Sequence, residues 1–220
     1  MALVIFDLDN TLIAGDSDHA WGECLVERKI VDADYYQAKN DQFFQDYHSG
    51  NLVIEEYLAF ALEPLANNTL DNLLSWRETF IEEKILPIML PKAKALIEKH
   101  RQQGDFLLII TATNHFVTEL IAQLLGVDDI IATIPEKNNT GFTGNISGTP
   151  SFKEGKITRL NEWLKDNNHS MSDSYFYSDS HNDLPLLKLV DNPIAVDPDT
   201  ILKAYCEKNN WPIQSLRIAE

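Results

Sequence analysis

Cysteine is scarce in this sequence: Cys24 and Cys206 are the only two in 220 residues. They lie far apart and without the spacing of a metal site, which indicates two reduced, packed thiols. Basic residues are also few, because 18 Lys and Arg stand against 34 Asp and Glu and leave a net charge of −16. This charge argues against a general nucleic-acid or anionic-membrane surface, so we expect neither partner. An anionic substrate stays open, since a local cation can override the global field.

Long hydrophobic runs are missing as well. No apolar stretch approaches the length of a membrane-spanning helix. The N-terminus has no basic segment, and Asp7 interrupts its apolar run, so we expect no signal peptide. The glycine patterns GxGxxG and GxxxxGK do not occur either. These absences predict a soluble cytoplasmic protein without a glycine loop for phosphate.

The most informative stretch that is present comes at the start of the chain. Residues 3–6, Leu-Val-Ile-Phe, are typical of a strand buried on both faces, and they run directly into Asp7, Asp9 and Thr11. Ligands of open α/β sheets lie beyond such a strand end. Two carboxylates so close together repel each other and need a cation or a proton between them. Mg²⁺ is a suitable cation, because it prefers hard oxygen ligands. The alternative is that the aspartates only end the strand in a turn.

The rest of the chain divides into a helical and an α/β part. Residues from about 18 to 84 have helical periodicity, with breaks at 31–32, 49–51 and 64–69, and we interpret most aromatics there as the core of a bundle. The sequence after Pro91 predicts helices at 92–103, 115–125, 152–164 and 199–208, strands at 106–110, 129–132, 175–177 and 193–196, and a hairpin excursion within 133–150. We therefore expect a doubly wound, Rossmann-like, mostly parallel sheet (residues 1–15 and 86–220) with an inserted α-helical cap (residues 16–85).

Polar side chains follow three of the expected strands. The carboxyl ends of parallel strands share one edge of a sheet, so chain-distant groups meet there. Lys156, near the start of a helix, could reach the same edge. The other groups are Asp7, Asp9 and Thr11 after the first strand, Thr111 after the second, and Asp179 and Asp183 after a later one.

This set of side chains suits phosphoryl transfer. Asp7 would attack phosphorus and form an aspartyl-phosphate, while Asp9 would protonate the leaving alkoxide and then activate water. Mg²⁺ on Asp7 and Asp179 would offset the repulsion between nucleophile and substrate. Thr111 and Lys156 would hold phosphate oxygens. Taken singly, each residue could instead be a turn, a cap or a solvated helix residue.

The motif DxDxT, a Thr that ends a second strand, a helix Lys and the later DSHND resemble the haloacid dehalogenase superfamily over essentially the whole chain. The helical insert resembles a C1-type cap, and the segments GDSDHAW and AVDPD resemble subfamily IB, with its phosphoserine-phosphatase-like and histidinol-phosphatase-like hydrolases. The resemblance implies Mg²⁺-dependent hydrolysis of a phosphomonoester. It implies the following roles: Asp7 as nucleophile, Asp9 as acid and base, Thr111, Ala112 and Lys156 at the phosphate, Asp7, Asp179 and the Asp9 backbone carbonyl at the metal, and Thr11, Asn182 and Asp183 in support.

The cap departs from the phosphoserine phosphatase pattern. Residues 29–75 contain no Arg for a substrate carboxylate, and the second motif reads Thr-Ala-Thr where Ser-Gly-Gly is usual. Asp16, Asp18, His19 and Trp21 follow the catalytic turn and are candidates for substrate specificity. The two acids would suit an amino-bearing substrate such as histidinol phosphate, with phosphoserine as the alternative.

Other functions stay open on the same chemistry. A broad-range phosphatase would share the whole mechanism, and a phosphotransferase would pass the phosphoryl group to an alcohol in place of water. A non-enzymatic regulator on the same fold is disfavoured, because every acid that the chemistry needs is present. The sequence leaves the oligomeric state open.

Overall fold

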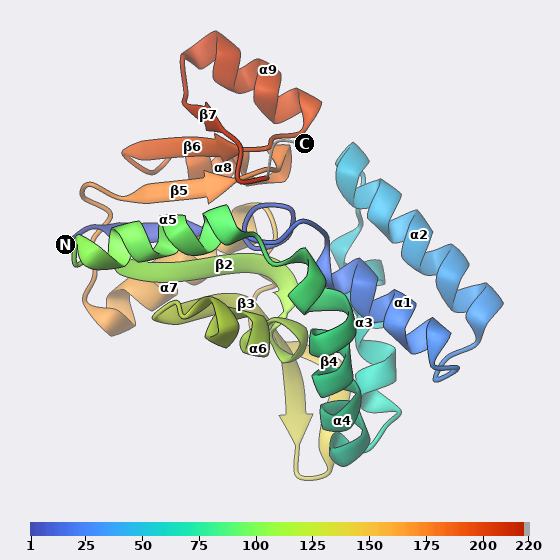
Figure 1. Cartoon of the computed structure of the whole chain (residues 1–220). Coiled ribbons are helices and arrows are strands. Elements are labelled where there is room, and N and C mark those ends of the chain that lie inside the picture. The colour runs from blue at the N-terminus through green and yellow to red at the C-terminus, as the bar shows by residue number, and fades with distance from the viewer. Residues whose placement is uncertain (218–220) are drawn as a thin grey trace.

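The structure, a computed structural model, describes residues 1–217. One sheet has the strand order β4-β3-β2-β1-β5-β6-β7, with β1 in its centre (Figure 1). All neighbours pair in parallel except β3 and β4, which form an antiparallel hairpin. The predicted α/β class with a mostly parallel sheet is confirmed. The strands are β1 (Leu3–Phe6), β2 (Phe106–Asn114), β3 (Asp129–Asn138), β4 (Gly141–Ser147), β5 (Tyr175–Ser178), β6 (Asn192–Val196) and β7 (Ile213–Gln214).

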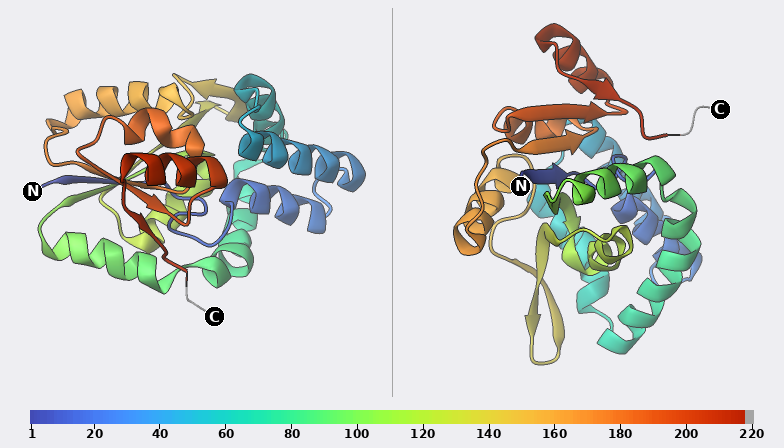
Figure 2. Two further views of the ribbon diagram at one scale, coloured as in Figure 1. Left: turned by 90° about the horizontal axis from the view of Figure 1, so that it is seen from above. Right: turned by 60° about the vertical axis from the view of Figure 1, so that its left-hand side comes forward.

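Helices cover both faces of the sheet, and β1 shows how its residues serve both. Val4 and Phe6 belong to one buried cluster, with side chains of α5 (Pro91–Gln102) and α6 (His115–Leu125). Leu3 and Ile5 belong to a second, with side chains of α7 (Glu154–Asn167), α8 (Leu184–Leu187) and α9 (Thr200–Asn209). Figure 2 shows α5 and α7 on opposite sides of the sheet. Successive strand residues point to opposite faces, which is why an uninterrupted apolar run is needed here.

Four helices form a separate group beyond the carboxyl ends of the central strands (Figure 1). They are α1 (Ser17–Glu27), α2 (Ala33–Ser49), α3 (Ile54–Ala66) and α4 (Leu70–Phe80), followed by a π-helical turn, η1 (Ile81–Ile85), and a 3₁₀ turn, η2 (Leu86–Ile88). The predicted break at 64–69 is wrong at its start, because α3 continues through Pro64. Proline this near a helix end removes one hydrogen bond only, and the Asn68 amide donates to the Pro64 carbonyl at 2.8 Å.

The chain enters and leaves this helical group at adjacent positions. Ile13 and Met89 form an antiparallel bridge, and the Ala14 N–H donates to the Ile88 carbonyl at 2.8 Å. The division into a core of residues 1–15 and 86–220 and a cap of residues 16–85 stays a prediction. Residues 218–220 of that core lie outside the described residues.

Some predicted ends of strands are wrong. The strand predicted at 106–110 continues as β2 to Asn114, and its register with β3 shifts between Ile110 and Asn114. The Thr133 hydroxyl donates to the Ala112 carbonyl at 2.9 Å and so replaces backbone pairing within this shift. The strand predicted at 129–132 likewise runs on to Asn138. The short edge strand β7 was not predicted.

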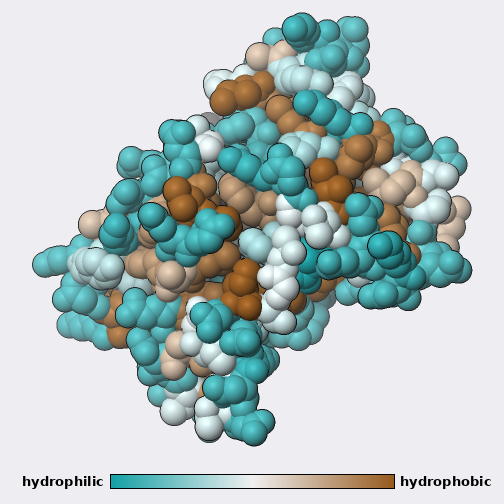
Figure 3. All heavy atoms as spheres, turned by 180° about the vertical axis from the view of Figure 1, so that it is seen from behind, coloured by the Kyte–Doolittle hydropathy of each residue, from teal (hydrophilic) through white to brown (hydrophobic). Residues whose placement is uncertain are grey.

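The surface seen from behind carries hydrophobic side chains in several separate groups between hydrophilic ones (Figure 3). Among the helices of residues 1–217, none combines the length and the apolar character needed to cross a membrane.

Candidate active site

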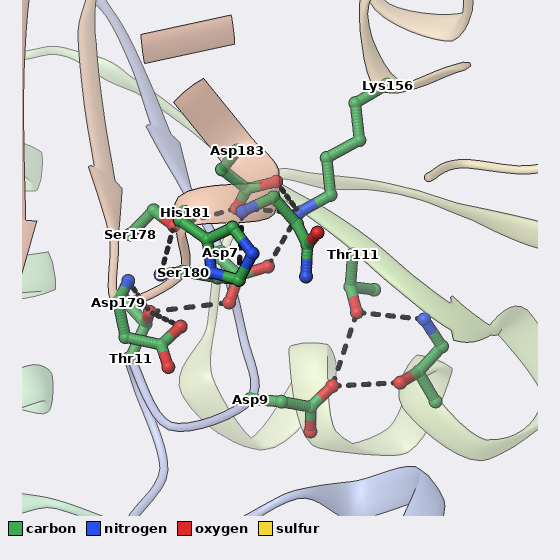
Figure 4. Close-up of polar contacts among 12 residues, drawn as sticks. Asp7, Asp9, Thr11, Thr111, Lys156, Ser178, Asp179, Ser180, His181 and Asp183 are labelled. Atoms are coloured by element: carbon green, nitrogen blue, oxygen red, sulfur yellow. Dashed lines mark hydrogen bonds and ion pairs between the residues drawn. The ribbon is translucent and has the colours of Figure 1, made fainter. Parts of the chain in front are cut away.

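Asp7 stands at the centre of a cluster of charged side chains at the carboxyl end of β1 (Figure 4). Its backbone N–H still donates to the Tyr177 carbonyl at 2.8 Å, so the sheet fixes its position. Its side chain is 6% exposed and lies 2.8 Å from the Lys156 ammonium. Burial raises the pKa of Asp7 to about 7, although the Lys156 charge acts in the opposite direction.

Lys156 comes from the first turn of α7 and joins two carboxylates. Its ammonium lies 2.8 Å from Asp7 Oδ1 and 2.7 Å from Asp183 Oδ1, and its side chain is 1% exposed. Asp183 also accepts a hydrogen bond from the Ser178 hydroxyl at 2.7 Å. Burial alone would lower the pKa of Lys156, but the charges of Asp183 and Asp7 outweigh it and raise that pKa. The lysine is therefore a fixed positive charge beside Asp7.

Thr11 lies between Asp7 and Asp179 (Figure 4). Its hydroxyl oxygen is 3.3 Å from Asp7 Oδ2 and 3.3 Å from Asp179 Oδ1, and it accepts the Asp179 N–H at 3.0 Å. A hydroxyl has one proton to donate, so it can satisfy only one of the two carboxylates at a time. Burial, followed by the charges of Asp7 and Asp183, raises the pKa of Asp179. This pair of carboxylates calls for a cation or a proton.

A magnesium ion fits this donor set. Mg²⁺ is commonly held by one or two carboxylates, with water and substrate phosphate completing the octahedron. Asp7 and Asp179 supply such a pair, and within residues 1–217 no larger group of His, Cys, Asp or Glu has the arrangement of a metal site. The Asp9 carboxylate, in contrast, is bound by the donors of Ser17 and Thr113.

Asp9 sits on the other side of Asp7, among hydrogen-bond donors. Its carboxylate accepts the Ser17 N–H at 2.6 Å, the Thr113 hydroxyl at 2.8 Å and the Thr111 hydroxyl at 3.4 Å. Burial, with a smaller effect of the Asp16 charge, raises the pKa of Asp9 to about 6, while the bonds from Ser17 and Thr113 oppose the rise. A carboxyl group with this pKa can both give and take a proton near neutral pH.

Sequence reasoning missed two of these polar contacts. Thr113 binds Asp9 more closely than the predicted Thr111 does, and Ser178 anchors Asp183. A signal for Thr113 was available, because residues two apart in a strand share a face. Ser178 directly precedes Asp179, but its contact depends on the turn that follows. The predicted Asn182 is buried and donates to the Tyr47 carbonyl in α2 at 3.0 Å.

A cavity of about 50 Å³ opens beside Asp7 and Asp9 towards the helical group. Of the cap residues singled out from the sequence, Asp16, Asp18 and His19 line it, as does Ala112 of β2. Trp21 does not line it. This indole is 2% exposed and packs edge-on against Phe80 and Phe116, at centroid distances of 5.3 and 6.0 Å.

Most of the helical aromatics belong to the buried cluster or pack against it, as predicted, but several also line the cavity. Phe43, Phe44, Tyr47 and Tyr57 line the cavity, although Phe43 also belongs to the buried cluster. Helical periodicity identifies the inward face of a helix, and here the inward face meets a cavity as well as other side chains.

Comparison with known proteins assigns this architecture to a family. A profile of the haloacid dehalogenase-like hydrolase family matches residues 4–188. A histidinol-phosphatase from Neisseria meningitidis serogroup C is 44% identical over 219 residues, which are 98% of this chain and 99% of that protein. A phosphoserine phosphatase from Mycobacterium tuberculosis is 28% identical over 224 residues, covering 99% of this chain and 72% of that protein.

Solved structures share the fold of this chain. A crystal structure of a protein with unknown function from Bordetella pertussis Tohama I has a TM-score of 0.92 at 39% identity and covers 98% of this chain and 99% of its own. A phosphoserine phosphatase, solved as an analogue of its phospho-aspartyl intermediate, has a TM-score of 0.71 at 17% identity, with 98% and 93% covered. At such low identity, this second likeness shows the shared fold.

Proposed function

This chain belongs to the haloacid dehalogenase-like hydrolase family, and we propose that it is a phosphatase that hydrolyses a small phosphomonoester through an aspartyl-phosphate on Asp7. One observation carries the proposal: a buried carboxylate held by a lysine, Asp7 with Lys156, shares one cavity with a second carboxyl group of raised pKa, Asp9. A nucleophile, a proton donor and a fixed positive charge are the groups that phosphoryl transfer needs.

In the first step, an oxygen of Asp7 attacks phosphorus and the ester P–O bond breaks. Lys156 stays charged and orients the Asp7 carboxylate through Oδ1. The same ammonium lowers the repulsion that an approaching phosphate would meet from Asp7 and Asp183. Asp9, in its protonated form, gives its proton to the leaving oxygen, so that an alcohol departs.

In the second step, Asp9 takes a proton from water as the water attacks phosphorus. The bond between phosphorus and Asp7 breaks, and inorganic phosphate and the original carboxylate result. The hydroxyl of Thr113 and the Ser17 N–H hold the Asp9 side chain throughout. A pKa of about 6 makes the two protonation states of Asp9 similarly accessible, as this exchange of roles requires.

Mg²⁺ is the cofactor that fits Asp7 and Asp179, with the Asp9 carbonyl as a further oxygen ligand. When bound, the ion supplies positive charge that offsets the negative charge of carboxylates and phosphate. Thr11 would then donate its single proton to whichever of the two carboxylates needs it, and Asp183 would keep Lys156 in place.

The substrate that we favour is an amino-bearing phosphomonoester, with histidinol phosphate first and phosphoserine second. The support is the 44% identity to a histidinol-phosphatase over almost the full chain and a cavity lined by four aspartates. A phosphotransferase or a broad-range phosphatase would use the same groups. The complete set of catalytic side chains argues against a purely regulatory role.

The experiment is a phosphate-release screen of the purified protein with and without Mg²⁺. It compares histidinol phosphate, phosphoserine, an aryl phosphate and a metabolite panel. We expect Mg²⁺-dependent release that chelation abolishes and that is lost in Asp7→Asn. Asp71→Asn, which changes an exposed aspartate of α4, is the matched control and should retain full activity.

Phosphate release by Asp7→Asn at the wild-type rate would refute the assigned nucleophile. Added alcohols separate hydrolysis from transfer, because a phosphotransferase would yield new phosphate esters in place of inorganic phosphate.

A further inference from the structure

Asp18 has no part in the chemistry proposed above, yet it lines the same cavity as Asp7 and Asp9. It lies in the first turn of α1, and the Tyr57 hydroxyl of α3 donates a hydrogen bond to its Oδ2. Tyr57 is itself partly buried, and this burial raises its pKa well above the usual value, so it remains a protonated donor. The Asp18 carboxylate is thus held in one orientation.

The other carboxylates of the cavity have assigned partners. Asp7 pairs with Lys156, and Asp9 accepts three hydrogen bonds. Asp16 caps α1, where its Oδ1 accepts the N–H groups of residues 18 and 19 at 3.0 and 2.8 Å. For Asp18, the tyrosine hydroxyl is the one side-chain donor recorded among residues 1–217.

No Lys or Arg of the described chain lines this cavity. The basic residue of the lining is His19, but its Nε2 lies 3.7 Å from both Glu23 and Asp41, which are outside the cavity lining. Burial of Asp18 opposes its ionised form and raises its pKa to about 7. A cation from the ligand would supply the charge that the protein does not.

The walls around Asp18 suit such a cation. Tyr57 meets Phe43 edge-on at a centroid distance of 5.5 Å, and both rings line the cavity. Aromatic faces attract ammonium groups, the more so where water is excluded. A carboxylate backed by aromatic rings is therefore a receptor for an organic ammonium group and a poor one for a second phosphate or a carboxylate.

We propose that Asp18, oriented by Tyr57, binds the ammonium group of the substrate while the phosphate of the same molecule lies at Asp7. This assignment rests on the proposed phosphatase function and names a residue that determines its specificity. It applies to a phosphomonoester with a primary amine on the alcohol side, whatever the remaining group is.

The test uses a matched pair of substrates, histidinol phosphate and the same phosphomonoester without its amino group. The quantity measured is the ratio of their kcat/KM values. A hydrogen-bonded charge pair is worth about tenfold to hundredfold, so the wild-type protein should prefer the amine by about that factor. Asp18→Asn should remove this preference, chiefly through a higher KM for the amine.

Three further variants complete the design. Tyr57→Phe frees the carboxylate without removing it, so the ratio should fall by about twofold to tenfold. Asp41→Asn removes a negative charge of α2 that lies outside the cavity lining, and its ratio should equal that of the wild type. Asp18→Glu retains the charge one methylene away and should retain part of the preference.

Equal losses on both substrates in Asp18→Asn, or the same change of ratio in Asp41→Asn, would overturn the assignment of Asp18. Phosphate release by the wild type without any preference for the amine would overturn it too, and would leave the phosphatase proposal standing. A wild-type protein that releases phosphate from no substrate would overturn both.

Discussion

Gly155 is the second residue of α7 and directly precedes Lys156. Because it has no side chain, the start of this helix can pack closely against the preceding loop. A Cβ placed on Gly155 would lie 2.0 Å from the Pro150 carbonyl oxygen, whereas real Cβ contacts stay above 3.0 Å. In Gly155→Ala the two segments must therefore separate by at least about 1 Å, a distance set by steric contact. The obstacle is backbone and cannot swing aside as a side chain would.

The helix start carries the lysine, so the same displacement acts on the ion pairs of Lys156 at 2.7 and 2.8 Å. A misplacement of about 1 Å in a catalytic group can cost about 100-fold in rate. Forcing an extra methyl group into a packed position costs about 1–3 kcal/mol of unfolding free energy. We expect Gly155→Ala to show both losses.

Phosphate-release kinetics and urea unfolding followed by circular dichroism measure the two effects. Gly104→Ala is the matched control, because Gly104 has nothing within 4 Å of an added Cβ but a φ of +77°. It should lose about 1–2 kcal/mol of unfolding free energy through backbone strain and keep its kcat/KM. Wild-type kcat/KM in Gly155→Ala would refute the reasoning.

Three more predictions follow from individual contacts. Lys156→Met leaves two buried carboxylates without their partner, so urea unfolding of the chelated protein at pH 8 should show a loss of about 3–5 kcal/mol; an unchanged midpoint would contradict this. Thr113→Val removes a hydrogen bond that favours ionised Asp9, so the pKa of Asp9 should rise above about 6, and the limb of the pH–kcat/KM profile that reports it should move to higher pH. Burial raises the pKa of Asp18 from 3.8 to about 7, so its ionisation lowers the stability of the fold progressively between about pH 4 and pH 7. The free energy of unfolding of Asp18→Asn, measured in urea, should therefore be higher than that of the wild type by about 1–3 kcal/mol at pH 8 and equal to it at pH 4. A variant that is less stable than the wild type at pH 8 would contradict this explanation.

The centre of the site could be predicted because its signals are local. An apolar run that ends in Asp7, or in Asp179, marks both a buried strand and the polar group at its end. Parallel pairing then brings strand ends together, whatever their separation in the chain. The structure places Asp7, Asp179 and Lys156 side by side, as this reasoning requires.

Other features depend on partners distant in sequence. Thr-Ala-Thr suits a turn as well as a strand, and the Thr133 hydroxyl, about twenty residues later, helps to hold it in β2. The spacing of Phe43 and Tyr57 is the same whether a helix faces other side chains or a cavity. The need for Gly155 arises from the Pro150 carbonyl, and nothing in the local pattern reveals that approach.

The bridge between Ile13 and Met89 has a consequence for how the family can diversify. Because Ile13 and Met89 are paired, the residues between them form a loop whose two ends are held together, whatever its length. Doubling a closed loop adds only about 0.6 kcal/mol of entropy cost, so a change in the length of the chain between Ile13 and Met89 adds little to the cost of closing the ring. Asp7 and Lys156 lie on the sheet side of this joint, and Asp18 and Tyr57 lie on its helical side. Grafting another helical module at the joint is thus a route to new substrates with the reaction unchanged.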